Sequence, residues 1–212
     1  SAFLRPDTGS VTLEGRDLTR LTPSTVAVLG VTRTFQQATP LAGLTVYQNV
    51  LVGMHRQFES GLGSIFLARR AVAREAQRLA GWANDLLETF GLRQLAEIDA
   101  KLLSFGQLRF LEIARAVATR PKFLLLDEPA AGLNEAERDQ LAIHISRFRK
   151  EGIGVLLVDH DVPFVFGLCD HMTVINFGSV IATGDPASVG RDPVVREAYL
   201  GNDSLENGDH AL

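Results

Sequence analysis

The sequence predicts an α/β fold built on a parallel sheet. Two apolar runs, Phe123–Leu126 and Ile153–Val158, show no alternation of apolar and polar residues, which is typical of parallel strands covered on both faces. A helical segment over residues 135–150 lies between them. Ionisable side chains follow both strands, at the edge where an open α/β sheet binds its ligands.

Composition supports a folded domain with an apolar core. The chain has 212 residues, of which 46% are hydrophobic and 22% are charged, enough to bury a full core. A net charge of −4 gives no electrostatic reason to expect a nucleic-acid partner. No apolar run approaches the roughly 20 residues that span a bilayer, and no basic-then-apolar leader opens the chain. Cys169 is the only cysteine, so we expect a cytosolic protein without an internal disulfide.

The first elements are short and are separated by turns. A turn at Glu14–Gly15 follows a short strand. Thr22 fits the N-cap of a helix over residues 23–29, which begins with proline and is followed by glycine. Residues 31–35 alternate as a strand, and Gln36 follows it.

A long amphipathic helix is predicted over residues 66–90. Its apolar residues recur every three or four positions from Val72 onward, and Gly91 closes it. Four arginines lie near its beginning: Arg69, Arg70, Arg74 and Arg78. Such a cluster is more often a solvated face than a partner-binding surface, and both interpretations stay open.

Residues 104–134 combine a loop, a helix, a strand and two adjacent carboxylates. Ser104 fits the N-cap of a helix over residues 107–119, and a helix N-terminus presents free N–H groups to an anion. Asp127 and Glu128 stand where the strand ends, and two carboxylates there suit a Mg²⁺ ligand beside a base that activates water. Asn134 has capping-box spacing for the next helix.

The last third of the chain begins with a polar cluster and continues as a hairpin. His160 stands between two aspartates directly after the second apolar strand. A hairpin over residues 174–183, with its turn at Gly178–Ser179, follows. Two further short helices open at prolines: Pro186 and Pro193.

Several of these segments together resemble an ATP-binding cassette (ABC) ATPase. Ser104–Gln107 is similar to the signature loop of that family, Phe123–Glu128 to its Walker B strand, and Gly132–Asn134 to its D-loop. Arg33–Gln36 and Val158–Asp161 resemble its Q-loop and H-loop. The closest subfamily is the ATP-binding subunit of bacterial importers of branched-chain or other hydrophobic amino acids. The stretches that carry this finer resemblance are residues 30–36, 112–116, 127–134 and 192–201.

The resemblance implies a P-loop NTPase (RecA-like) α/β core. Residues 1–212 would form one incomplete ABC ATPase domain, with a helical subdomain inserted over residues 45–120. No G-x-x-x-x-G-K-[ST] sequence occurs in the chain. That phosphate-binding loop supplies most of the β/γ-phosphate contacts in the family. We therefore expect an N-terminally truncated chain that lacks the P-loop and its strands and is not competent alone.

The resemblance also implies ATP and Mg²⁺ as cofactors and assigns roles to individual residues. Asp127 and Gln36 would contact Mg²⁺, with Gln37 as the alternative to Gln36 if the register shifts by one. Glu128 would activate the attacking water, and His160 would contact the γ-phosphate. The residues implied to contact nucleotide on the opposite subunit are Ser104, Phe105, Gly106, Gln107 and Asn134.

The implied activity is ATP hydrolysis that powers amino acid uptake. The implied partners are a second ABC ATPase subunit, identical or not, and transmembrane permease subunits that hold the protein at the cytoplasmic face of the plasma membrane. Two alternatives stay open: an ATPase subunit of another ABC system, such as lipopolysaccharide export, and a non-hydrolysing interaction module. ATP binding would distinguish the module from the ATPases. The transported substrate is not fixed by the sequence, because the ATPase subunit does not contact it.

Overall fold

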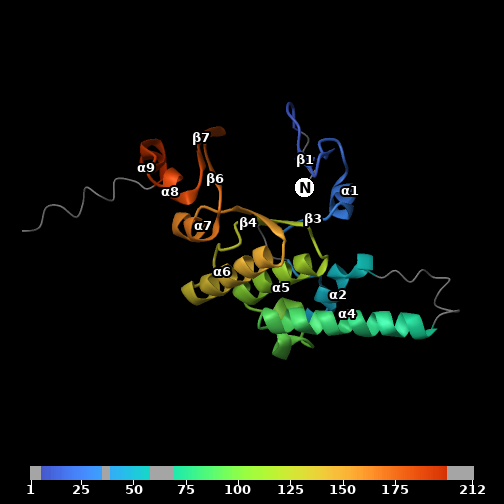
Figure 1. Cartoon of the computed structure of the whole chain (residues 1–212). Coiled ribbons are helices and arrows are strands. Elements are labelled where there is room, and N and C mark those ends of the chain that lie inside the picture. The colour runs from blue at the N-terminus through green and yellow to red at the C-terminus, as the bar shows by residue number, and fades with distance from the viewer. Residues whose placement is uncertain (1–5, 35–38, 58–68, 200–212) are drawn as a thin grey trace, which may run out of the picture. The chain divides into compact units, whose positions relative to one another are not determined.

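The structure is a computed structural model that describes residues 6–34, 39–57 and 69–199 (Figure 1). The chain divides into two compact units, Ser1–Asp159 and His160–Leu212. A single domain with a helical subdomain over residues 45–120 stays a prediction.

The first unit contains the parallel sheet and the long helices. Its described elements, in which η marks a 3-10 helix, are β1 (Thr12–Leu13), β2 (Arg16–Asp17), α1 (Pro23–Val28), β3 (Val31–Arg33), α2 (Val46–Gly53), η1 (His55–Gln57), α4 (Arg69–Thr89), η2 (Arg93–Leu95), η3 (Ala100–Leu102), α5 (Phe105–Ala118), β4 (Phe123–Asp127), α6 (Glu135–Lys150) and β5 (Gly154–Val158).

The sheet has the strand order β3-β4-β5, and both pairs are parallel, as predicted. Leu125 of β4 aligns with Arg33 of β3 on one side and with Leu156 of β5 on the other. Aligned residues of parallel strands lie on the same face, and side chains two positions apart in one strand do as well. Arg33, Leu125 and Asp127 therefore share one face of the sheet.

The two faces of the sheet are covered unequally. Leu124 and Leu126 are buried, and the Thr32 hydroxyl on their face is hydrogen-bonded to the hydroxyl of Thr119 at the end of α5, at 2.8 Å. On the other face, Leu156 and Val158 are 58% and 56% exposed. Burial on both faces, which the apolar run predicts, is therefore wrong for β5 within the described residues. The helix α5 lies on the face that carries Leu124 and Leu126.

Helix boundaries follow the capping residues that the sequence contains. Thr22, Ser104 and Asn134 cap α1, α5 and α6, and each side chain accepts a hydrogen bond from the backbone N–H three residues later. The α5 helix begins at Phe105, two residues before the predicted start, because the capping box places Gln107 at the third helical position. Helix α2 is an element that the sequence analysis does not assign.

Helices α2, α4 and α5 pack on one another. The α2 and α5 backbones approach closely at Gly53, where a Cβ would collide with the carbonyl oxygen of Arg115. The predicted apolar face of α4 is buried from Leu79 to Phe90, whereas Ala76, nearer its start, is exposed. Within the described ranges, no helix combines the length and apolarity needed to cross a bilayer.

The second unit is built on an antiparallel hairpin. Its described elements are α7 (Val162–Leu168), β6 (Met172–Asn176), β7 (Ser179–Gly184), α8 (Pro186–Val189) and α9 (Pro193–Tyr199). The hairpin turn lies at Phe177–Gly178, one residue before the predicted position, and both residues have positive φ (46° and 79°), as a two-residue type I′ turn requires. The prolines predicted to open the last two helices do so.

Candidate functional site

The carboxyl end of β4 carries a charged side chain on the less covered face of the sheet. Asp127, the last residue of β4, has an exposed fraction of 26%. Its Oδ2 lies 2.6 Å from the guanidinium Nη2 of Arg33 on the neighbouring strand β3. The two side chains can meet because Arg33 is aligned with Leu125, two residues before Asp127, and both Arg33 and Asp127 lie on the same face. A carboxylate is thereby presented at the sheet edge beside a fixed positive charge.

Glu128 has an unusual backbone for a residue with a side chain. Its φ is 45°, in the left-handed region, while its N–H donates to the carbonyl of Val158 at 2.7 Å. The hydrogen bond extends the β4–β5 ladder by one residue, and the positive φ then turns the chain out of the sheet. Such a conformation costs on the order of 1–3 kcal/mol and is concentrated at functional sites.

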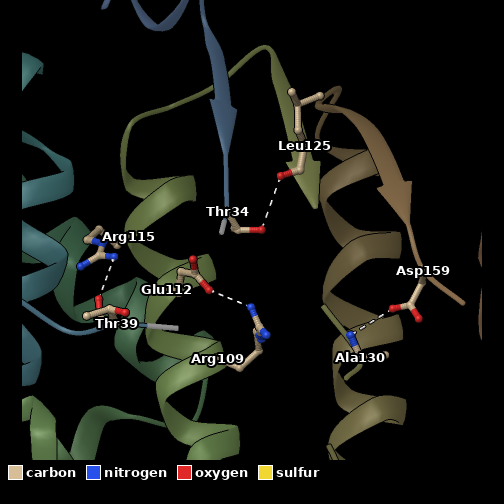
Figure 2. Close-up of polar contacts among 8 residues, drawn as sticks. All are labelled: Thr34, Thr39, Arg109, Glu112, Arg115, Leu125, Ala130 and Asp159. Carbon is tan, nitrogen blue, oxygen red and sulfur yellow. Dashed lines mark hydrogen bonds and ion pairs between the residues drawn. The ribbon is translucent and has the colours of Figure 1, made fainter. Parts of the chain in front are cut away.

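A tight turn over residues 129–134 follows Glu128, and we call it the turn 129–134. The N–H of Ala131 donates to the carbonyl of Glu128 at 3.2 Å. The N–H of Ala130 donates to Oδ2 of Asp159, also at 3.2 Å, so a residue after β5 holds the turn after β4 (Figure 2). The turn ends at Asn134, which caps α6.

The segment 104–107 forms the N-terminal end of α5. The Ser104 hydroxyl accepts from the N–H of Gln107 at 3.3 Å, and the Gln107 side-chain oxygen accepts from the N–H of Ser104 at 2.9 Å. Both polar side chains are thus engaged in the capping box. The first N–H groups of the helix, those of Phe105 and Gly106, lack an intrahelical acceptor by helix geometry and can face an anion. The Phe105 ring is 51% exposed.

A buried ion pair lies within α5. The guanidinium of Arg109 and the carboxylate of Glu112 are 3.0 Å apart, and their side chains are 1% and 5% exposed (Figure 2). Burying both charges requires the pairing, because a lone buried charge costs several kcal/mol. The pair lies on the same helix whose first turn is the segment 104–107.

A second polar connection links α5 to the chain after β3. Arg115 donates to the carbonyl of Thr39 at 3.3 Å (Figure 2). It also donates to the Asn49 side-chain oxygen at 3.4 Å. The same Asn49 oxygen accepts from the N–H of Leu41 at 2.9 Å. Burial lowers the pKa of Arg115 from its ordinary value, although the nearby Glu112 carboxylate opposes that shift. Residues 39–41 are therefore tied to both α2 and α5.

The structure brings only some of the predicted site residues together. Asp127 and Glu128 are adjacent at the sheet edge, and the segment 104–107 contacts the turn 129–134 through Phe105 and Gly132. Gln36 and its alternative Gln37 lie outside the described residues. His160 belongs to the second unit, where its side chain is exposed.

The residues at this edge fit a magnesium ion that arrives with a nucleotide. In the described part of the chain, no group of three or more His, Cys, Asp or Glu side chains could hold a metal by itself. Mg²⁺ in phosphate-handling sites is commonly held by one or two carboxylates, substrate phosphates and water. A single half-buried carboxylate such as that of Asp127 fits this set and not a cage made only of protein ligands.

Known protein families provide a test of the resemblance to ABC ATPases. The family model described as ABC transporter matches residues 1–131. The chain belongs to the ABC transporter family. A second model, described as branched-chain amino acid ATP-binding cassette transporter, matches residues 179–204 of this ABC protein.

Relatives of this ABC protein share more than a third of its residues. The high-affinity branched-chain amino acid transport ATP-binding protein LivG of Salmonella typhimurium is 39% identical over 206 residues, 95% of this chain and 79% of LivG. BraF of Pseudomonas aeruginosa, described in the same words, is 38% identical over 202 residues, again 95% of this chain and 79% of BraF. The predicted relation to the branched-chain subfamily is confirmed.

Solved structures agree with the predicted fold class. A nucleotide-free ATP-binding cassette from an ABC transporter matches with a TM-score of 0.76 and 33% identity, covering 94% of this chain and 80% of that one. The ADP conformation of an ATP-binding cassette matches with a TM-score of 0.76 and 32% identity, covering 95% and 80%. The chain therefore has the fold of an ABC ATPase, as predicted.

Two residues at the site have contacts that sequence reasoning missed. Arg33 was noted only as part of a motif, and Asp159 only as a neighbour of His160. Strand register gives a signal for Arg33, because it aligns with Leu125, two residues before Asp127. Asp159 follows Val158, which aligns with Asp127, and this places its carboxylate near the turn 129–134.

Proposed function

We propose that this chain belongs to the ATP-hydrolysing subunit of an importer for branched-chain or other hydrophobic amino acids, and that residues 1–212 do not hydrolyse ATP alone, because they contain no G-x-x-x-x-G-K-[ST] sequence. The observation that carries the proposal is the pair Asp127–Glu128, in which a half-buried carboxylate ends β4 and the next residue turns out of the sheet with a φ of 45°. The relatives named above are branched-chain amino acid transport ATP-binding proteins, and their names support the class of cargo.

In this mechanism the two carboxylates have different roles. Glu128 accepts a proton from the water that attacks the γ-phosphate, and its backbone, fixed by the bond to Val158, positions the carboxylate for that transfer. Asp127 would hold Mg²⁺, an ion that neutralises charge developing on the phosphates when it is bound. Positioning and charge stabilisation then account for most of the rate.

The remaining site residues are proposed to act on the phosphates. His160 would contact the γ-phosphate and orient the attacking water, and Gln36 would contact Mg²⁺ and connect the site to the permease. The residues proposed to close over the nucleotide of a second ATPase subunit are Ser104, Phe105, Gly106, Gln107 and Asn134. The first N–H groups of α5 suit this role, because a helix N-terminus leaves them without intrahelical acceptors and available to an anion.

The proposed partners follow from this shared site. We propose a dimer of ATPase subunits bound to transmembrane permease subunits at the cytoplasmic face of the plasma membrane. The proposed permease-facing surface consists of the arginines of α4: Arg70, Arg74 and Arg78. Their exposed side chains support the proposal that a partner contacts them.

Reconstitution tests the function and the class of cargo together. The full-length protein, co-expressed with its permease subunits, is placed in proteoliposomes with a binding protein loaded with leucine or left empty. We expect ATP hydrolysis that leucine-loaded binding protein stimulates, with leucine entering the vesicles. Hydrolysis that responds to lipopolysaccharide and not to leucine would favour the export alternative. A complex that forms but hydrolyses no ATP would favour the interaction module.

A further inference from the structure

A contact between the first residue of α5 and the turn 129–134 has no role in the mechanism above. The Phe105 ring lies so close to Gly132 that a Cβ on the glycine would stand 2.6 Å from the ring Cε1. Gly132 also has a φ of 76°, a conformation that residues with side chains rarely adopt. The backbone therefore favours glycine at this position, and a Cβ there would force the Phe105 ring to shift.

A second contact joins the start of α5 to α6, the helix that directly follows the turn. The Glu137 carboxylate lies against Gly106, where a Cβ would collide with its Oε1. That carboxylate also accepts a hydrogen bond from the N–H of Asn134 at 3.0 Å and closes the capping box of α6. The start of α5 therefore contacts the turn at Gly132 and the first turn of α6 at Glu137.

The other end of the turn is continuous with Glu128. The Ala131 N–H donates to the Glu128 carbonyl at 3.2 Å, and the Leu133 N–H donates to the Ala130 carbonyl at the same distance. Only three residues separate Glu128 from Gly132. The left-handed backbone of Glu128 persists only if its surroundings over-determine it, and the turn is the part of those surroundings that follows it in the chain.

Simple apolar burial does not account for the Phe105 ring, because half of its surface remains exposed. The ring instead lies against Gly132 with the edge formed by Cδ1, Cε1 and Cζ, and the Arg109 guanidinium lies 6.0 Å from its centroid. We infer that Phe105 is a positioning residue, whose ring fixes the turn 129–134 and through it the backbone of Glu128.

This role rests on the proposed function and deepens it. The segment 104–107 is proposed to close over the nucleotide of a second subunit, whereas Glu128 acts on the nucleotide of its own. The contact between Phe105 and Gly132 then links the two nucleotide sites of a dimer. A displacement of the segment 104–107 by the partner's nucleotide is transmitted to the base in the other site.

A double-mutant cycle in the full-length protein tests the contact. The variants are Phe105→Ala, Gly132→Ala and the two combined, with Phe105→Tyr as the conservative change and Leu102→Ala as a matched control. Leu102 is also apolar and exposed (68%), but it precedes the capped helix. The readouts are kcat, KM for ATP, Tm and the amide exchange rates of residues 129–134 measured without nucleotide.

We expect Phe105→Ala to lower kcat about tenfold and to accelerate exchange at Ala131 and Leu133. Phe105→Tyr should keep the exchange rates of the wild type, and Leu102→Ala should change neither kcat nor exchange. Gly132→Ala adds a steric collision to backbone strain, and removal of the ring relieves the collision. The kcat loss caused by Gly132→Ala should therefore be about fivefold smaller in the Phe105→Ala background. Strictly multiplicative losses, or unchanged exchange in Phe105→Ala, would overturn the inference.

Failure of the proposed function and failure of the positioning role of Phe105 give different results. If the wild-type protein hydrolyses no ATP, the proposed function fails, yet the exchange measurements still decide whether Phe105 fixes the turn. If hydrolysis is normal and Phe105→Ala leaves both kcat and exchange unchanged, only the positioning role fails. A Phe105→Leu variant serves in place of Phe105→Ala if the latter does not fold, with the same expected directions.

Discussion

The guanidinium of Arg33 and the carboxylate of Asp127 lie 2.6 Å apart across two neighbouring parallel strands. The pair places a fixed positive charge beside the carboxylate proposed to hold Mg²⁺. A cation that binds Asp127 must displace or share this partner. We therefore expect the Arg33 side chain to influence the Mg²⁺ concentration at which hydrolysis is half-maximal.

Replacing Arg33 by glutamine should lower the Mg²⁺ concentration that gives half-maximal ATP hydrolysis by the full-length protein. Stability should change by less than about 1 kcal/mol, because both side chains are partly exposed. A magnesium titration of the initial rate measures the effect. Arg93→Gln, an exposed arginine on η2, removes the same charge elsewhere and should leave the titration unchanged. Equal shifts in both variants would rule out a local role for Arg33.

The buried pair Arg109–Glu112 should contribute far more to stability than an exposed pair of similar geometry. Glu112→Ala leaves the Arg109 guanidinium buried without its paired carboxylate and should cost about 3–5 kcal/mol of unfolding free energy. The matched variant Glu151→Ala breaks the exposed pair Arg147–Glu151, which has a 2.8 Å separation, and should cost about 1 kcal/mol at most. Urea denaturation of both variants measures the difference. Similar losses would show that burial of the first pair does not matter.

His144 should make the protein less stable in mild acid. Its ring packs against Phe90 and Phe110, and burial lowers its pKa from the ordinary value of 6.5. The neutral ring is therefore favoured in the folded state. Its contribution to stability is complete above the unfolded-state pKa and is lost as pH falls below about 6.5.

Unfolding free energies between pH 8 and pH 5 measure this dependence. His144→Phe, which keeps an aromatic ring in the cluster, should flatten the curve over that window. His55→Gln, a change at an exposed histidine, should leave the curve as it is in the wild type. An unchanged slope in His144→Phe would assign the acid sensitivity to other groups.

Much of the fold follows from local sequence. Capping residues such as Ser104 and Asn134 define helix starts, because their side chains bond N–H groups only three residues away. The unbroken apolar run of β4 likewise predicts a parallel strand. Such signals lie within a few residues of the element that they specify, and therefore need no knowledge of tertiary structure.

Contacts between distant segments were not predictable in this way. The approach of Phe105 to Gly132 and the hydrogen bond from Ala130 to Asp159 depend on how strands and helices are placed in space. The exposure of Leu156 depends on which face the helices cover, whereas its sequence neighbours indicate only that it belongs to an apolar strand. The hairpin turn lies one residue before its predicted position, because Phe177, and not Ser179, adopts the positive φ beside Gly178.

The role of Glu128 as the base that activates water is the central claim, and Glu128→Gln in the full-length protein tests it most directly. Glutamine keeps the size of the side chain but cannot accept the proton, so we predict that ATP still binds while kcat falls at least about 100-fold. Single-turnover hydrolysis and equilibrium binding of labelled ATP, measured on the same preparation, separate the two effects. A kcat within about threefold of wild type, with ATP bound normally, would contradict the assignment of Glu128 as the base.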